Sequence, residues 1–171
     1  AAGHQPVVVD SFVNSRPSVI ARLEELTGEH IETHSFDLRD ADKTSALFAE
    51  GGFDAVIHFA GLKAVGESAQ KPLWYYTNNV SGTVNLLWAM EENGCRSIVF
   101  SSSATVYGVP EAMPLTEKLS MDAQNPYGRT KEHIEDMLAD LAASDERVSK
   151  GQAALARNRA SLNAIEARYG V

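Results

Sequence analysis

A tyrosine and a lysine stand four residues apart in this chain, at Tyr127 and Lys131. On a helix this spacing puts both side chains on one face, so that the ammonium can lie near the phenol. A phenol titrates at about pH 10 and is a poor base at neutral pH, but a neighbouring cation stabilises the phenolate. The pair therefore indicates proton transfer by Tyr127. An ordinary tyrosine at a helix start, followed by a solvated lysine, is the alternative.

A run of three serines, at positions 101–103, follows a short apolar segment that predicts a buried strand. In an open α/β sheet ligands bind at the carboxyl ends of the strands, so a hydroxyl group there faces the site. Ser103 is thus a candidate to hydrogen-bond the oxygen whose proton Tyr127 transfers. Turn formation or helix capping is the alternative role for such a run.

The elements that must position these residues alternate between short apolar segments and longer helical patterns, which is typical of βαβ units. Strands are expected at residues 6–10, 31–36, 54–60 and 97–101. Helices are expected between Ser15, which offers a cap, and Gly28, which offers a stop, and at residues 40–50, 72–93 and 127–142. We therefore expect an open, mostly parallel, Rossmann-like α/β sheet over residues 5–143, with right-handed crossovers.

The composition limits the class of protein. The 171 residues are 44% hydrophobic and 22% charged, which suits one globular domain. A net charge of −8 argues against nucleic acid or an anionic membrane as the main partner. Cys95 is the only cysteine of the sequence, so we expect no disulfide within the chain and no thiolate metal cage. The single cysteine fits a reducing cytoplasm, and the first four residues carry no basic region followed by an apolar stretch, so we expect no signal peptide.

Three motifs together resemble one enzyme family. They are FAGLKAVGES at residues 59–68, SSSATVYG at 101–108 and NPYGRTK at 125–131. The serine, tyrosine and lysine resemble the catalytic set of the short-chain dehydrogenase/reductase superfamily, and the motifs are similar to those of UDP-glucose 4-epimerases over residues 3–143. In that family bound NAD takes hydride from carbon 4 of the UDP-sugar and returns it to the other face of the 4-keto intermediate. The resemblance implies this activity, with UDP-glucose and UDP-galactose as substrates.

The resemblance also implies individual roles. Tyr127 would be the acid/base, Ser103 its hydrogen-bonding partner, and Lys131 a residue that tunes Tyr127 and contacts the nicotinamide ribose. Asp10 would bind the adenosine ribose, which is consistent with NAD rather than NADP. The implied cofactor-binding residues are Asp10, Ser11, Phe12, Val13, Asn14, Ser15, Asp37, Leu38, Phe59, Ala60, Gly61, Lys63, Asn78, Tyr127 and Lys131, and the implied substrate-binding residues are Lys63, Ser103, Thr105 and Tyr127. A structural role, such as helix capping by Asp37, is the alternative for several of them.

Two features of the family pattern do not occur in these 171 residues. The family begins with a strand and a glycine-rich turn for the cofactor pyrophosphate, whereas no three glycines here have GxGxxG or GxxGxxG spacing. That first strand should lie centrally, between residues 6–10 and 54–60, so we expect a split sheet whose open edges favour a homo-oligomer. After the partial NAD-binding domain, residues 1–143, an Ala- and Arg-rich segment at 144–171 predicts a helical tail in place of the family's substrate domain.

Three functions stay open at this point. The first is the epimerase. The second is a catalytically inactive fragment or engineered scaffold derived from one, and we expect the 171-residue chain alone to be inactive. The third is a sister enzyme, such as a nucleotide-sugar dehydratase, which must protonate a leaving hydroxyl. The dehydratases of the family keep an Asp-Glu pair after the threonine near the catalytic tyrosine loop, whereas here Ser103 is followed by Ala104, Thr105 and Val106, with no acid. The dehydratase is therefore the least favoured.

Overall fold

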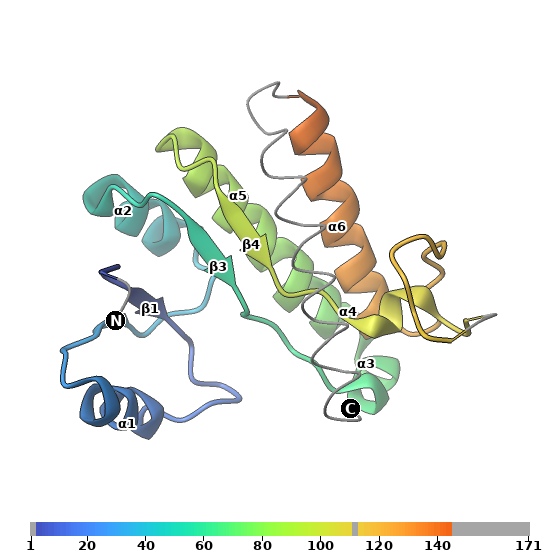
Figure 1. Cartoon of the computed structure of the whole chain (residues 1–171), viewed down its shortest axis with the longest axis horizontal. Coiled ribbons are helices and arrows are strands. Elements are labelled where there is room, and N and C mark those ends of the chain that lie inside the picture. The colour runs from blue at the N-terminus through green and yellow to red at the C-terminus, as the bar shows by residue number, and fades with distance from the viewer. Residues whose placement is uncertain (1–2, 111–112, 145–171) are drawn as a thin grey trace.

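The computed structural model describes residues 3–110 and 113–144 (Figure 1). Its elements are β1 (Val7–Val9), α1 (Ser18–Thr27), β2 (Glu32–His34), α2 (Ala41–Gly51), β3 (Val56–His58), α3 (Val65–Gln70), α4 (Pro72–Tyr75), the π-helical turn η1 (Tyr76–Ser81), α5 (Gly82–Glu92), β4 (Ile98–Phe100), the 3-10 turn η2 (Ala104–Tyr107) and α6 (Pro126–Ser144). This order confirms the predicted alternation of strands and helices. The predicted tail lies outside the described residues, apart from Ser144.

The four strands form two separate parallel pairs. β1 pairs with β2, with Val8 opposite Thr33, and β3 pairs with β4, with Ile57 opposite Val99. Within the described residues no ladder joins one pair to the other, and Figure 1 shows β1 apart from β3 and β4. The predicted parallel pairing and the predicted split of the sheet are both confirmed. Each strand spans three residues, which is shorter than its apolar segment indicated.

One face of the β3–β4 pair carries most of the core. Phe100 of β4 packs against Ile134 and Leu138 of α6, and both α5 and α6 run along β4 in Figure 1. A second cluster joins α2 to α5 through Phe48, Leu86, Ala89, Met90 and Cys95. Successive side chains of a strand point to opposite faces, and Ile57, on the other face of β3, is 63% exposed.

The helix predicted over residues 72–93 is interrupted. α4 passes directly into the π-helical turn η1, which is followed by α5. A π-helical turn has i→i+5 hydrogen bonds and contains one more residue than an α-helical turn, so it rotates the side chains that follow it. A pattern of hydrophobic residues averaged over the segment cannot locate such a turn. The short helix α3 was not predicted either.

The cap predicted at Ser15 is wrong. Pro17 holds the cap position of α1, with no side-chain cap hydrogen bond, and the helix ends at Gly28 as predicted. The Ser15 hydroxyl donates instead to Asp10 Oδ2 at 2.8 Å. Because this bond reaches back toward β1, Ser15 stabilises the loop before the helix rather than the helix itself.

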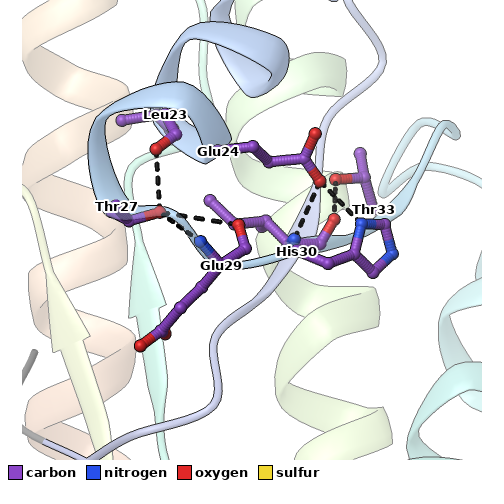
Figure 2. Close-up of polar contacts among 7 residues, drawn as sticks. Leu23, Glu24, Thr27, Glu29, His30 and Thr33 are labelled. Carbon is purple, nitrogen blue, oxygen red and sulfur yellow. Dashed lines mark hydrogen bonds and ion pairs between the residues drawn. The ribbon is translucent and has the colours of Figure 1, made fainter.

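Short-range polar contacts hold the turn between α1 and β2 (Figure 2). The Glu24 carboxylate accepts a hydrogen bond from the Ile31 amide at 2.9 Å and lies 2.7 Å from His30 Nδ1. These two contacts hold the pKa of Glu24 below its ordinary value, the amide having the larger effect. The Thr27 hydroxyl donates to the Leu23 carbonyl at 2.9 Å. α1 contains no buried residue, so this turn depends on polar contacts more than on a core.

Among the helices of residues 3–110 and 113–144, none is both long enough and apolar enough to cross a membrane.

Candidate active site

The first turn of α6 presents the predicted catalytic tyrosine. Asn125 caps this turn, because its Oδ1 accepts a hydrogen bond from the Gly128 amide at 2.8 Å. Pro126 occupies the first helical position, where its lack of an N–H costs nothing. Tyr127 and Lys131 follow one turn apart, and their side chains are 9% and 5% exposed. Both residues are therefore buried on one side of the helix, as their spacing predicts.

Lys131 lies at the carboxyl end of β4. Its ammonium donates to the Ser101 carbonyl at 2.9 Å and lies 4.6 Å from the centre of the Phe100 ring. Burial lowers the pKa of Lys131 to about 8. At neutral pH the side chain is still mainly protonated, so a cation is present beside the serine run. This contact ties α6 to the end of the strand that carries Ser103.

Ser103 caps the 3-10 turn η2. Its Oγ accepts hydrogen bonds from the Thr105 amide at 3.3 Å and from the Thr105 hydroxyl at 3.0 Å. The alternative capping role of the serine run is therefore present, yet the Ser103 hydroxyl keeps its own proton to donate. η2 also packs tightly on α6, because a Cβ at Gly128 would lie 2.9 Å from the Thr105 carbonyl oxygen.

Tyr127 belongs to a small buried cluster with Leu62 and Tyr75. The fully buried Tyr75 donates from its hydroxyl to Glu67 Oε2 at 3.0 Å and accepts from the Ala64 amide at 3.0 Å. The structure therefore brings the segment after β3 against the start of α6. Within the described residues the Tyr127 hydroxyl forms no hydrogen bond with Ser103 or Lys131.

The loop after β1 is organised by Asp10. Its Oδ1 accepts from the Phe12 amide at 2.7 Å, and its Oδ2 accepts from the Ser15 hydroxyl at 2.8 Å. A carboxylate offers about four acceptor positions, so Asp10 keeps room for two further donors. Asn14 Nδ2 reaches the Gly61 carbonyl at 3.4 Å, which brings this loop to the loop after β3. The predicted residues with exposed side chains are Ser11, Val13, Asn14, Phe59, Ala60 and Lys63.

Asp37 does not cap a helix. It forms a two-point ion pair with Arg39, at 3.0 Å to Nε and 2.7 Å to Nη2, and this pairing lowers the pKa of Asp37. Arg39 in turn lies 4.4 Å from the centre of the Trp74 ring. The cap of α2 is Asp40, and the Leu38 carbonyl accepts from Asn85 Nδ2 at 3.0 Å. Asp37 and Leu38 are thus held between β2, α2 and α5.

Two neighbouring asparagines occupy the π-helical turn η1. Asn78, the one chosen from the sequence, is half-buried and donates from Nδ2 to Asn79 Oδ1 at 3.0 Å. Asn79, which sequence reasoning missed, is 2% exposed and hydrogen-bonds both the Leu62 backbone and Thr130. The sequence carried only a weak signal, two adjacent polar residues in an apolar helical pattern. The rotation at η1 decides which of them faces inward.

A parallel α/β arrangement, in which a helix that carries a tyrosine and a buried lysine packs at the end of a strand followed by serines, is typical of the short-chain dehydrogenase/reductase class. Comparisons with known proteins agree. The family model described as GDP-mannose 4,6 dehydratase matches residues 3–149. UDP-glucose 4-epimerase 2 of Arabidopsis thaliana is 52% identical over 146 residues, and the UDP-glucose 4-epimerase of Bacillus subtilis is 50% identical over 144. Each alignment covers 84% of this chain and 42% of the relative.

Solved structures give the same result. A UDP-glucose 4-epimerase from Bifidobacterium longum, in complex with NAD+ and UDP, superposes with a TM-score of 0.82 at 44% identity, over 84% of this chain and 43% of that one. One from Stenotrophomonas maltophila, with bound NAD and formylated UDP-arabinopyranose, has a TM-score of 0.80 at 48% identity, over 83% and 42%. The chain belongs to the NAD-dependent epimerase/dehydratase family of extended short-chain dehydrogenases/reductases. It spans under half the length of the curated relatives that it matches.

Proposed function

We propose that the protein containing this chain is a UDP-glucose 4-epimerase, which interconverts UDP-glucose and UDP-galactose through transient oxidation at carbon 4 of the sugar. The observation that carries the proposal is the meeting of three motifs at the start of α6. Tyr127 packs on Leu62 of the first motif, and Lys131 hydrogen-bonds Ser101 of the second. The names of the most similar relatives support the same activity.

In this proposal, side chains of this chain transfer a proton to and from the substrate. The Tyr127 phenolate oxygen takes the proton of the sugar 4-hydroxyl, and the phenol so formed later returns it. Ser103, whose hydroxyl proton is still available, hydrogen-bonds the same sugar oxygen, and Thr105 and Lys63 contact the substrate nearby. The cationic Lys131 stabilises the phenolate form of Tyr127. Its buried position at the end of β4 keeps this charge within the site.

The residues present fit NAD as the cofactor, which supplies the acceptor and donor of the hydride when it is bound. Asp10 keeps free acceptor positions suited to two ribose hydroxyls, beside a loop formed by residues 11–15. Gly61 and its neighbours lie against this loop through Asn14. The adenine and ribose contacts would be completed by Asp37, Leu38 and Asn78. Lys131 would contact the nicotinamide end of the cofactor.

An epimerase is favoured over a dehydratase even though the matching family model carries a dehydratase name. Elimination of a hydroxyl group requires an acid that protonates it. Ser103 is followed by Ala104, Thr105 and Val106, none of which carries a carboxyl group. The segment after Ser103 therefore supplies no acid for a leaving hydroxyl, and proton transfer is limited to the oxygen that Tyr127 serves.

Replacing the Tyr127 hydroxyl tests the proposal. In the complete enzyme that carries these residues, Tyr127→Phe should lower kcat on the order of 10²–10⁴-fold, because a general acid/base is lost. NAD should stay bound, since the ring still packs on Leu62 and Tyr75. Tyr76→Phe is the matched control, because Tyr76 lies against His133 outside this cluster. Turnover of UDP-galactose near the wild-type rate in Tyr127→Phe would remove Tyr127 from this role.

We further infer that the 171-residue chain alone neither holds NAD tightly nor epimerises UDP-sugars. Affinity for a dinucleotide in this fold depends strongly on backbone amides at a glycine-rich turn, a pattern these residues do not contain. Hydride transfer also needs its reacting atoms within about 3–3.5 Å, which a sheet in two parts does not secure. Calorimetric titration of the mass-verified chain with NAD, followed by an assay with UDP-galactose, tests this inference. Micromolar NAD binding or measurable turnover would contradict it.

A further inference from the structure

Glu135 on α6 is a buried carboxylate that takes no part in the proposed reaction. It is 4% exposed and follows Ile134, which packs on Phe100 of β4. Burial of a carboxylate is costly unless the group is hydrogen-bonded or paired. Glu135 Oε1 accepts a hydrogen bond from the Ser102 hydroxyl, although the two residues are 33 positions apart. A charged group in the core therefore contacts the serine run at the end of β4.

The end of β4 is anchored to α6 at two successive residues. The Lys131 ammonium donates to the Ser101 carbonyl at 2.9 Å, and one turn later along the helix Glu135 accepts from the Ser102 hydroxyl. The two contacts cannot exchange partners, because an ammonium only donates and a carboxylate only accepts. One hydrogen bond would let the strand end pivot about a single point. Two hydrogen bonds at neighbouring residues fix both its position and its rotation relative to α6.

The next residue along the chain is Ser103, the predicted partner of Tyr127. Its backbone is extended, with φ −151° and ψ 147°. Phe100 and Ser102 are two positions apart and both contact α6, so Ser103 is turned to the other side of the extended chain. η2 begins directly after Ser103, whose carbonyl accepts from the Val106 amide at 3.2 Å. The anchor at Ser102 therefore sets the direction of the Ser103 side chain and the base of η2.

We propose that Glu135 is a positioning residue for the reaction, an inference that rests on the proposed function above. Tyr127 and Glu135 are both buried on α6, about two turns apart. Because Glu135 holds Ser102 at a fixed place along this helix, the hydroxyls of Ser103 and Tyr127 reach one sugar oxygen together. Without this anchor the strand end shifts relative to α6, and a misplacement of about 1 Å costs on the order of 10²-fold in rate.

Replacement of the serine in the complete enzyme provides the first test. Ser102→Ala removes the donor and should lower kcat about 10- to 100-fold, while KM for UDP-galactose changes less than about threefold. Ser68→Ala is the matched control and should keep the wild-type kcat, because Ser68 is also buried but donates to the Val65 carbonyl within α3. Equal kcat in the two variants would overturn the proposal, whereas an inactive wild-type enzyme would overturn the proposed function instead.

The α6 side of the contact is tested at Glu135. Glu135→Ala should lower kcat by a similar factor, and Glu135→Gln, which keeps an acceptor for the Ser102 hydroxyl, should recover most of that loss. Asp136→Asn, at an exposed position, controls for the loss of one negative charge from the helix and should keep kcat. In the double variant of Ser102→Ala with Glu135→Ala, the two effects should be less than additive, because both remove one contact. Full additivity, or no recovery with glutamine, would show that this contact does not position Ser103.

Amide hydrogen exchange in the complete enzyme gives a readout that does not depend on activity. Glu135→Ala and Ser102→Ala should both speed exchange of the Val106 amide, because η2 loses its fixed base. The Ser101 amide, which donates to the His58 carbonyl at 3.1 Å in the β3–β4 pair, should exchange as in the wild-type enzyme. Unchanged exchange at Val106 in Glu135→Ala would contradict the proposed role whatever the kinetics show.

Discussion

The two ends of the described chain are held together by different interactions. In residues 3–37 the helix α1 buries no side chain, and apart from the β1–β2 ladder most hydrogen bonds join residues within seven positions of each other. In residues 53–144, buried contacts join distant segments, such as Asn79 to Thr130, 51 positions apart, and Lys131 to Ser101, 30 apart. The candidate catalytic residues belong to the second region. Catalysis requires fixed distances, and only the region with long-range buried contacts supplies them.

The cofactor residues divide along the same line. Asp10 and the loop at residues 11–15 lie in the first region, whereas Tyr127 and Lys131 lie in the second. An exposed hydrogen bond of 3.4 Å, from Asn14 Nδ2 to the Gly61 carbonyl, joins the loop after β1 to the loop after β3. A ligand that contacts both regions would therefore stabilise their relative placement more than it would change the structure within either region.

Truncation of a core side chain should show the largest difference between the regions. Ile134→Ala removes a side chain that is 1% exposed and packed on Phe100, and it should lower the free energy of unfolding by about 2–5 kcal/mol. Leu23→Ala in α1, where the side chain is 39% exposed, should cost less than about 1 kcal/mol. Urea unfolding of the 171-residue chain measures both values. Equal losses would show that α1 contributes to the core.

Acid should weaken the second region through His58. Burial, with a smaller effect from the Lys131 charge, lowers the pKa of His58 to about 4, against 6.5 in the unfolded chain. Between these values the unfolded chain binds the proton and the folded chain does not, so stability falls as pH decreases from 6.5 to 4. The effect of this group is up to about 3 kcal/mol. His58→Gln, which keeps a polar partner for Thr83, should show a smaller decrease across this window in unfolding measurements at several pH values. The same decrease in both proteins would rule out His58 as its source.

Removal of helix caps gives the smallest expected difference. Asn125→Ala at the start of α6 should cost about 1 kcal/mol, because the Gly128 amide loses its acceptor. Ser15→Ala should stay within about 0.5 kcal/mol of the native chain, because Ser15 caps no helix and its bond to Asp10 is local. Thermal unfolding of the two variants compares them directly. A larger loss in Ser15→Ala would mean that the loop after β1 contributes more than its local bonds indicate.

Much of the fold followed from local sequence. The short apolar segments around Val8, Thr33, Ile57 and Val99 gave the strands, and the parallel pairing follows from the helices between them. The Tyr127–Lys131 spacing gave the shared helix face, because four residues are about one turn. The split of the sheet was predicted from the pattern of the family rather than from periodicity.

Tertiary contacts decided what local patterns could not. Ser15 is suited to a cap, but Asp10 competes for its hydroxyl, and that competition depends on how the loop closes. Asp37 has the chemistry of a cap, yet Arg39 holds its carboxylate. Asn79 is distinguished from Asn78 only by a π-helical turn, whose extra residue alters the direction of every later side chain. The sequence by itself determined which residue types are available for proton transfer and which elements form. The tertiary structure decided which polar groups are buried together, because burial and hydrogen bonding depend on segments up to 51 positions apart.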